Sequence, residues 1–372
     1  MSSIPSKRQA SGGNTRVQWY RCPIEPAKIR ELTKRSDLKG AFYVFGHLLL
    51  FGVTAFVAHY FFVRQIWIGF AAALLVHGTI RGVGGSGGHE LAHGTVFRTK
   101  WLNAIFLRIW GILGWFNFHH YKMSHTYHHL YTLHPDRDGE VMLPVNYPIR
   151  ILMLLQILTF NIVGFVRTVM TNLRVAFTGK FRGEWSARIF TPEQVLPHKR
   201  AVRWPRIVLA VHAVVLAVSA VFGLWVIPIT FTLGNFIGGW YIYLIGATMH
   251  SGLRDNVPDF RLCTRTIRLD PLSGFLRWNM HYHIEHHMFA AIPCYNLGKL
   301  YRAVESDMPK RRTLFGAWKE MKETERRQRT DPDYQFDTPL PKPSDDGAER
   351  DPIGAAIGDI RPGGFVESPP ST

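Results

Sequence analysis

The chain has 372 residues, 47% of them hydrophobic, and 44 Lys and Arg against 27 Asp and Glu give a net charge of +17. The basic residues crowd beside apolar runs, as on the cytoplasmic side of a membrane, so we expect membrane flanking and no nucleic-acid binding. Three widely spaced cysteines, Cys22, Cys263 and Cys294, exclude a disulfide framework and indicate a reducing compartment.

The N-terminal part predicts a membrane hairpin. Residues 1–39 are polar and end in a basic cluster directly before the apolar run 41–63. That run is free of charged residues and long enough to cross a hydrocarbon core of about 30 Å. A second run, 66–80, follows a very short turn and returns the chain to the face where it started. The basic flank places the N-terminus in the cytoplasm, without a cleavable secretory signal.

Two marginal apolar runs come next. The run 102–118 is interrupted by Arg108, and the run 151–170 by Arg167. The segment 172–206 that follows is strongly basic, which indicates the cytoplasmic side. We therefore expect both marginal helices to lie along the membrane surface or dip into it.

A second hairpin is predicted from the runs 205–227 and 228–250, with Pro228 at the turn. Four crossings leave both termini in the cytoplasm. The expected fold is thus an all-α membrane protein with four transmembrane helices in two hairpins, a cytoplasmic histidine-rich cap and a disordered C-terminal tail.

The same features divide the chain into three parts. Residues 1–39 form a cytoplasmic segment, 40–318 the membrane domain and 319–372 a polar tail. From about residue 330 the tail is rich in Pro, Gly and Asp and poor in periodic apolar residues, so we expect it to be largely disordered.

Eighteen histidines occur, and their spacing points to metal binding. Residues at i, i+3 and i+4 of a helix lie within about 100° of one another, so each cluster is expected to aim its imidazoles at one point. The topology places three clusters and one further histidine on one face of the membrane: His89 and His93; His125, His128 and His129; His283, His286 and His287; and His250.

The number of imidazoles indicates two metal ions. Eight or nine converging histidines exceed the three or four ligands of one zinc ion by about twofold. Imidazole also suits copper, iron and nickel, so the ligand type alone does not name the metal. Open, imidazole-rich coordination at a membrane surface favours redox-active iron that binds O2 over closed structural zinc.

The segment HELAH, residues 89–93, also fits the H-E-x-x-H motif of zinc peptidases. A peptidase needs one further ligand and a glutamate that activates water, which would leave six or more histidines without a role. We therefore interpret Glu90 as a partner that orients a ligating imidazole.

The ordered set of motifs resembles the integral-membrane fatty acid desaturase family. HELAH, HTYHH at 125–129 and HIEHH at 283–287 are similar to its three histidine boxes, and the similarity runs from about residue 40 to 318, including NMHYHIEHHMFAAIPCYNLGKL. The resemblance implies a non-haem di-iron centre and O2-dependent removal of two hydrogens from an alkyl chain. The implied iron ligands are His89, His93, His125, His128, His129, His283, His286 and His287, with His250 as the additional ligand after the last span.

One position departs from the family pattern. Some members carry, four residues before the additional histidine, an asparagine that reaches the iron through water, and this chain has Gly246 there. The remaining histidines are expected in other roles. His47, His59, His77 and His212 lie inside apolar spans and should be hydrogen-bonded within the bundle, whereas His119, His120, His134 and His281 should be partners of ligands or surface residues.

The aromatic residues near the histidine boxes could line a substrate tunnel or anchor the chain at the membrane interface, and the nearby glycines could form a phosphate loop or allow close helix packing. Trp110, Trp115, Phe116, Phe118, Trp240, Tyr241 and Tyr243 are candidates for a substrate tunnel, but anchoring at the membrane interface is the favoured interpretation. The glycines of RGVGGSGG, 81–88, lack the features of a phosphate loop and indicate close helix packing.

The expected substrate is a fatty acyl lipid or acyl thioester from the bilayer of a bacterial inner membrane, or of the endoplasmic reticulum in a eukaryote. No flavin, nicotinamide or haem motif is present, since RPGG has Arg361 where a cytochrome b5 domain has its haem histidine, so we expect an external ferredoxin or cytochrome b5-type donor. Four alternatives stay open: a hydroxylase, a desaturase of a small amphiphile such as an amino-acid-derived metabolite, a zinc peptidase and a non-catalytic scaffold.

Overall fold

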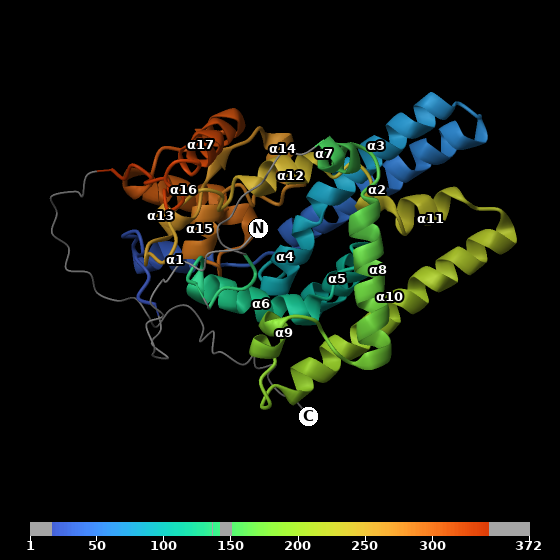
Figure 1. The fold of residues 1–372 in the computed structure, drawn as a ribbon, viewed down its shortest axis with the longest axis horizontal. Coiled ribbons are helices and arrows are strands. Elements are labelled where there is room, and N and C mark those ends of the chain that lie inside the picture. The colour runs from blue at the N-terminus through green and yellow to red at the C-terminus, as the bar shows by residue number, and fades with distance from the viewer. Residues whose placement is uncertain (1–16, 136, 142–150, 342–372) are drawn as a thin grey trace.

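The computed structural model describes residues 17–135, 137–141 and 151–341, and these residues are mostly helical (Figure 1). Among them, three helices are long and apolar enough to cross a membrane: Asp37–Val63, Trp67–His93 and Val195–Phe222. All three were expected, as the runs 41–63, 66–80 and 205–227, although the third helix begins ten residues and ends five residues before the predicted run.

Helices α2 (Asp37–Val63) and α3 (Trp67–Gly84) lie side by side, joined by a short turn in which Gln65 has a φ of 55° (Figure 1). The chain stays helical through Gly85 into α4 (Ser86–His93), so one helix of 27 residues leads directly to the first histidine cluster. The helix ends at Gly94, whose φ of 68° suits a residue without a Cβ.

The third long helix is α10 (Val195–Phe222), which ends at Gly223 with a φ of 67°. The expected fourth span, 228–250, is wrong as a continuous helix. It consists of α11 (Val226–Phe231), the short 3-10 helix η1 (Gly234–Phe236) and α12 (Trp240–Ala247). Glycines at 234, 238 and 239 favour breaks, and Gly238 has a φ of 58°.

The turn of this second pair also differs from the prediction. The chain reverses at Gly223–Trp225, and Pro228 lies inside the first turn of α11, where its missing N–H costs no helical hydrogen bond. Irregular backbone at membrane depth is tolerated where it is buried in protein or lines a cavity, and the broken segment lines the cavity described below.

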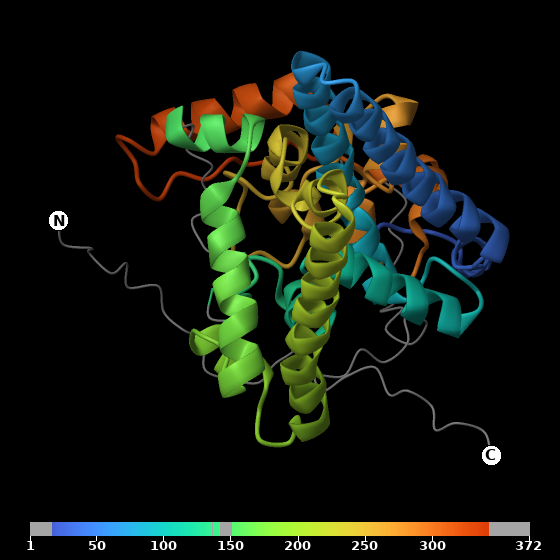
Figure 2. The same ribbon diagram turned by 90° about the vertical axis from the view of Figure 1, so that its right-hand side faces the viewer.

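The two marginal runs form three helices. The first becomes α5 (Lys100–Leu113), and the second divides into α7 (Ile151–Leu158) and α8 (Ile162–Thr178). The break falls at Asn161, whose side chain accepts a hydrogen bond from the Gly164 N–H and caps α8. Helices α8 and α10 lie side by side (Figure 2).

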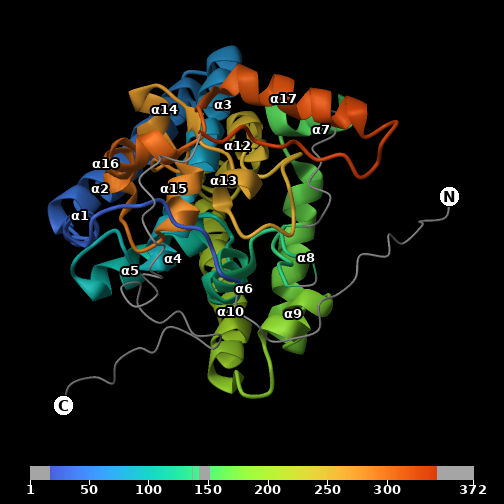
Figure 3. The same ribbon diagram turned by 90° about the vertical axis from the view of Figure 1, so that its left-hand side faces the viewer.

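The histidine-rich cap is built from short elements, among which α4, α6 (Phe118–Tyr131) and α15 (His283–Met288) meet (Figure 3). The parallel pair β1–β2 aligns Ile267 with Arg312. The other elements of the cap are α1 (Pro26–Leu32), α9 (Glu184–Ile189), α13 (Phe260–Cys263), β1 (Ile267–Arg268), α14 (Pro271–Leu276), η2 (Cys294–Asn296), α16 (Leu297–Val304), η3 (Glu305–Asp307), β2 (Arg312–Thr313) and α17 (Leu314–Arg327).

The beginning of the expected polar tail is ordered. Helix α17 extends to Arg327, and beyond it the Phe336 N–H donates to the Gly252 carbonyl at 2.8 Å while Thr338 is buried. The rest of the tail, 342–372, lies outside the described residues.

A single large core cluster joins the membrane helices to the cap. Trp278, Phe260 and Met288 are fully buried in it. Cys22, Cys263 and Cys294 are buried and unbonded to one another, as the sequence predicted. The histidine clusters therefore lie in a close-packed part of the protein interior.

Candidate metal centre

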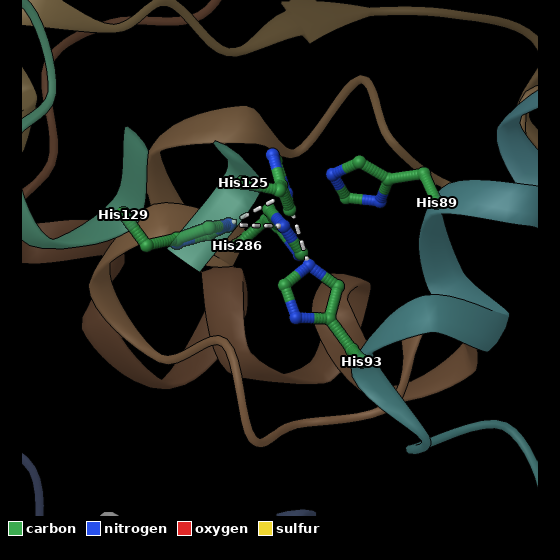
Figure 4. Close-up of side chains that lie close together, drawn as sticks. All are labelled: His89, His93, His125, His129 and His286. Carbon is green, nitrogen blue, oxygen red and sulfur yellow. Dashed lines mark hydrogen bonds between the residues drawn. The ribbon is translucent and has the colours of Figure 1, made fainter. Parts of the chain in front are cut away.

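The nine predicted histidines come together in two neighbouring groups. In each group, one ring nitrogen from every member lies within 4.8 Å of the corresponding nitrogens of the others. Group one consists of His89, His93, His125, His129 and His286 (Figure 4), and group two consists of His128, His250, His283 and His287.

The clusters of α6 and α15 are each divided between the two groups, which corrects the expectation that one cluster aims at one point. Each residue turns a helix by about 100°, so positions four apart differ by about 40°, whereas adjacent positions differ by about 100°. On α6, His125 and His129 therefore share group one, while His128 faces group two. On α15, His283 and His287 share group two and His286 faces group one.

The Nε2 atoms approach one another within each group. In group one, His125 Nε2 lies 3.2 Å from that of His93 and 3.0 Å from that of His129, and the His286 to His129 separation is 3.2 Å. His89 Nε2 is buried with no hydrogen-bond partner among the described residues. In group two the Nε2 atom of His283 lies 2.9 Å from that of His250 and 3.2 Å from that of His287.

These separations fit metal binding. Neutral imidazoles whose Nε2 lone pairs face one another repel unless a cation or a proton lies between them. Cis ligands at about 2.1 Å from a shared ion are about 3.0 Å apart, close to the observed separations.

The Nδ1 atoms on the outer side of the rings are held by acceptors. His125 Nδ1 donates to Glu140 Oε1 at 2.8 Å, and His128 Nδ1 donates to Asp138 Oδ2 at 2.8 Å. His250 Nδ1 donates to the Cys263 carbonyl at 3.0 Å. An acceptor at Nδ1 fixes the proton there and leaves the Nε2 lone pair for a metal.

The carboxylate of Glu90 has the position expected for an orienting partner. Its Oε1 accepts from His89 Nδ1 at 2.9 Å and lies 3.7 Å from His286 Nδ1. It therefore contacts the outer nitrogens of two imidazoles in group one, on the side of each ring away from Nε2.

Asp138 and Glu140 were not identified from the sequence. They follow α6 in the loop segment DRDGE, where acidic residues have no periodic pattern. Their position directly after the second cluster, in a chain with few acids, was the available signal. Backbone N–H groups also hold the loop, since Leu133 N donates to Asp138 Oδ2 and Glu140 N to Oδ1, both at 3.0 Å.

Burial keeps much of group two neutral. Burial lowers the pKa of His250 to about 3 and holds the pKa values of His283 and His287 well below the usual value, aided by neighbouring imidazoles. His128 differs: although burial opposes its charge, the Asp138 carboxylate raises its pKa. Against its own burial, Asp138 has its pKa lowered to about 2 by His128. Neutral imidazoles are the form that binds metal.

The other histidines lie outside both groups. The expectation for three histidines in apolar helices is confirmed, because His47, His77 and His212 each make two hydrogen bonds within the bundle, to Tyr43 and Leu276, to Thr54 and Thr230, and to Thr232 and Ile112 respectively. His120 Nε2 bonds to Ser186 Oγ at 3.0 Å. For His59 the expectation is wrong, because its side chain is exposed and makes no hydrogen bond among the described residues. His119, His134 and His281 are absent from the histidine groups of the described residues.

A cavity of about 500 Å³ opens onto both groups, a volume suited to a small amphiphile or alkyl chain. Five of the nine histidines line it: His89, His125, His128, His250 and His283. Its apolar wall includes Phe51, Trp110, Leu113, Phe116 and Ile242, and its polar wall includes Arg81, Arg277, Asn235 and Glu140. Gly246 also lines the cavity, and a Cβ there would meet nothing within 4 Å.

The aromatic candidates separate into two sets. Trp110 and Phe116 line the cavity, whereas Trp115, Phe118, Trp240, Tyr241 and Tyr243 are absent from its lining. Trp115 and Trp240 instead donate to Thr232 and Thr79, each within the helical bundle.

The glycine-rich segment packs closely, as expected. A Cβ at Gly87 would lie 2.5 Å from Trp110 Nε1 and 2.6 Å from Trp278 Cζ2. Replacing Gly87 by alanine is expected to destabilise the fold by about 1–3 kcal/mol, because neither indole can shift in the packed core. Thermal unfolding of the purified protein measures this. Gly246→Ala is the matched control, and equal unfolding temperatures for the two variants would contradict the packing argument.

The comparison with known protein families gives a match. A family model described as fatty acid desaturase matches residues 64–318, a range that contains all nine histidines of the two groups. No individual curated protein matches the chain at a significant level.

Proposed function

We propose that this chain, which belongs to the fatty acid desaturase family, is an O2-dependent membrane oxidoreductase that introduces a double bond into an alkyl chain at a di-iron centre. The family uses iron and implies oxidoreductase chemistry, and the three long apolar helices fit a membrane protein. A fatty acyl lipid or acyl thioester is the substrate class that the family favours.

One observation carries the proposal: two groups of histidines, five and four, both contribute side chains to the lining of one cavity. Two sets of imidazole ligands suit two iron ions. Bound there, the iron pair with O2 would supply the oxidising power to break unactivated C–H bonds. In the overall reaction the substrate loses two hydrogen atoms. O2 is reduced to two water molecules by these two hydrogen atoms together with two electrons from the donor and two protons.

The residues of the chain orient the metal ligands and line the cavity with apolar side chains. Helices α4, α6 and α15 hold eight of the nine imidazoles, and Asp138, Glu140 and Glu90 fix the orientations of the His128, His125 and His89 rings through Nδ1. Trp110 and Phe116 give the cavity an apolar wall beside the histidines. A substrate held there presents one part of its chain to the metal site, which determines the position of reaction.

The geometry argues against a peptidase. In a zinc peptidase with H-E-x-x-H, the glutamate acts as a base on a metal-bound water. Here Glu90 Oε1 contacts the Nδ1 atom of His89, on the side of the ring away from Nε2. The carboxylate is placed to orient a ligand.

A second candidate substrate class is a small amphiphile that enters the cavity whole. It is favoured by two buried arginines, Arg81 and Arg277, in the cavity wall. Hydroxylation is the alternative reaction on the same scaffold, and the identity of the product distinguishes it from desaturation.

We further propose an external acidic ferredoxin or cytochrome b5-type electron donor, because the chain carries +17 and has no electron-carrier motif. Turnover with such a donor is expected to fall as salt rises from 50 to 500 mM, since screening weakens steering between opposite charges. Steady-state rates with acidic and neutral donors measure this, and identical salt-insensitive rates with both would exclude charge-guided docking.

Both termini are proposed to lie in the cytoplasm, of a bacterial inner membrane or on the endoplasmic reticulum of a eukaryote. The basic flank of α2 supports this orientation. The test introduces single cysteines at residues 65 and 224, in the two turns, and labels them with a reagent that does not cross the inner membrane of intact bacteria expressing the chain. Exclusion of both cysteines from the reagent would contradict the orientation.

The function is tested by expressing the chain in a host of known lipid composition and profiling its lipids and small acids by mass spectrometry. A loss of two mass units in one product class, dependent on O2 and absent with His286→Ala, is the expected result. A gain of sixteen mass units would identify a hydroxylase. No change in any class, with the protein folded and loaded with iron, would overturn the proposal.

A further inference from the structure

The cavity beside the histidines has a positively charged wall that alkyl chemistry alone does not require. We propose that the substrate carries a negatively charged group into the cavity and that Arg81 binds this group. This inference rests on the proposed function and specifies its substrate: an amphiphile with an acidic terminus inside the protein.

Arg81 lies on α3 within an apolar helix and is 5% exposed. Its Nη2 donates to the Leu113 carbonyl, and its guanidinium carbon lies 5.0 Å from the centre of the Phe51 ring. No carboxylate of the described part of the chain lies within 4.0 Å of its guanidinium nitrogens. A buried charge without a counter-charge is costly at membrane depth, and such residues mark binding sites.

Two other buried arginines of the described residues have acidic partners. Arg265 pairs with Glu320, and Arg261 pairs with both Asp259 and Asp307 at 2.8 and 2.7 Å. Both arginines lie in the cap and are absent from the cavity lining. Arg81 is thus a cavity-facing arginine whose counter-charge has to come from a bound molecule.

A structural role for Arg81 does not account for its charge. Leu113 is the last residue of α5, and a donor at its carbonyl satisfies the end of that helix. A neutral donor meets such a need elsewhere in the same region, since Trp204 Nε1 donates to the Phe116 carbonyl at 2.9 Å. A neutral side chain at position 81 would avoid the cost of burying a charge.

The position of Arg81 relative to the histidines suits substrate orientation. Eight residues of continuous helix separate it from His89, about 12 Å along the axis. The surface between them includes Gly82, Gly85 and Gly88, which line the cavity without side chains. An alkyl part can therefore lie against this helix, with the acidic group at Arg81 and C–H bonds near group one.

A second guanidinium lies between these two ends. Arg277 lines the cavity, and its Nη1 donates to Ser86 Oγ, one turn of helix before His89. The cavity lining thus has two guanidinium groups and one carboxylate, that of Glu140. This excess of positive charge disfavours a cationic amphiphile and attracts an anion. An acyl thioester bound through a large head group outside the protein would leave the charge of Arg81 without a counter-charge.

The first test compares ligands on the unaltered holoenzyme in neutral detergent. Radiolabelled dodecanoate bound to the immobilised protein is competed by unlabelled dodecanoate, dodecyl phosphate, methyl dodecanoate and dodecanol. The acidic compounds are expected to compete at concentrations at least about tenfold lower than the neutral ones, the size of a charge-assisted hydrogen bond. Tighter binding of dodecyl phosphate would assign the anion to a phosphate-bearing lipid, and tighter binding of dodecanoate to a free carboxylic acid.

The second test uses matched variants. Arg81→Gln is expected to lose the tenfold preference, and Arg81→Lys to keep part of it. Arg108→Gln is the control, because Arg108 is exposed, also donates to a backbone carbonyl, that of Ala104, and also lies over a phenylalanine ring, that of Phe118. Arg108→Gln should bind dodecanoate as the unaltered protein does.

Two results would overturn the inference: equal competition by dodecanol and dodecanoate, or an unchanged preference in Arg81→Gln. The ligand comparison needs no variant, so it stands even if Arg81→Gln fails to fold. Binding is measured without turnover. If the protein binds acids preferentially but desaturates none of the compounds, the proposed reaction is wrong and the anion site is still supported.

Discussion

Replacing His129 by alanine is expected to remove the iron of group one and to lower activity by more than about 100-fold. Loss of a residue that hydrogen-bonds to a metal ligand typically costs about 10–100-fold in metal affinity or activity, and loss of the ligand itself should cost more. The Nε2 atom of His129 lies within 3.2 Å of the Nε2 atoms of both His125 and His286, at the centre of group one. Group two does not include His129, so its metal should remain. Iron content per chain and product formation are measured on the same sample.

A control on the same helix separates ligand loss from damage to α6. His120 is part of α6 and bonds to Ser186, outside both groups. His120→Ala should keep its iron and most of its activity. If His129→Ala retains the full iron content and activity, the assignment of group one is wrong.

Neutralising the carboxylates behind the imidazoles should have the second largest effect. Asp138→Asn and Glu140→Gln are each expected to lower iron affinity or activity on the order of 10–100-fold. The Asp138 carboxylate accepts from His128 Nδ1 and from the Leu133 N–H through the same oxygen, and Glu140 accepts from His125 Nδ1. An amide keeps the shape but provides a weaker acceptor for the imidazole N–H.

Iron affinity is measured by competition with a chelator, which reports the effect apart from turnover. Glu193→Gln is the control, because Glu193 is exposed and distant in sequence from the clusters. Chelator curves for Asp138→Asn and Glu140→Gln that match the unaltered protein would show that the carboxylates do not hold the ligands.

The long helices and the nine histidines were predictable from the sequence, because both depend on local patterns. An uncharged apolar run of membrane length has few structural alternatives, and α2 covers the whole predicted run 41–63. Histidines at i, i+3 and i+4 of a helix predict metal binding, and the structure brings all nine into two groups. Their division between the groups follows from helix geometry and was missed because each cluster was treated as one face.

The remaining features depend on contacts that hydropathy does not report. The run 228–250 is apolar throughout, yet Gly238 with a φ of 58° and the 3-10 turn at Gly234–Phe236 break it. Asp138 and Glu140 act through a loop that folds back on α6, which no periodic pattern predicts. The role of Arg81 emerges only when the cavity and the lack of a described carboxylate near it are both known.

The central claim is that the two histidine groups hold a pair of iron ions that oxidise the substrate with O2. Its most direct test is the metal content of purified protein measured together with its O2-dependent activity. Two irons per chain in the active fraction, with activity falling in proportion as a chelator removes iron, is the predicted result. Full activity with fewer than two irons per chain, or with zinc and without O2, would contradict it.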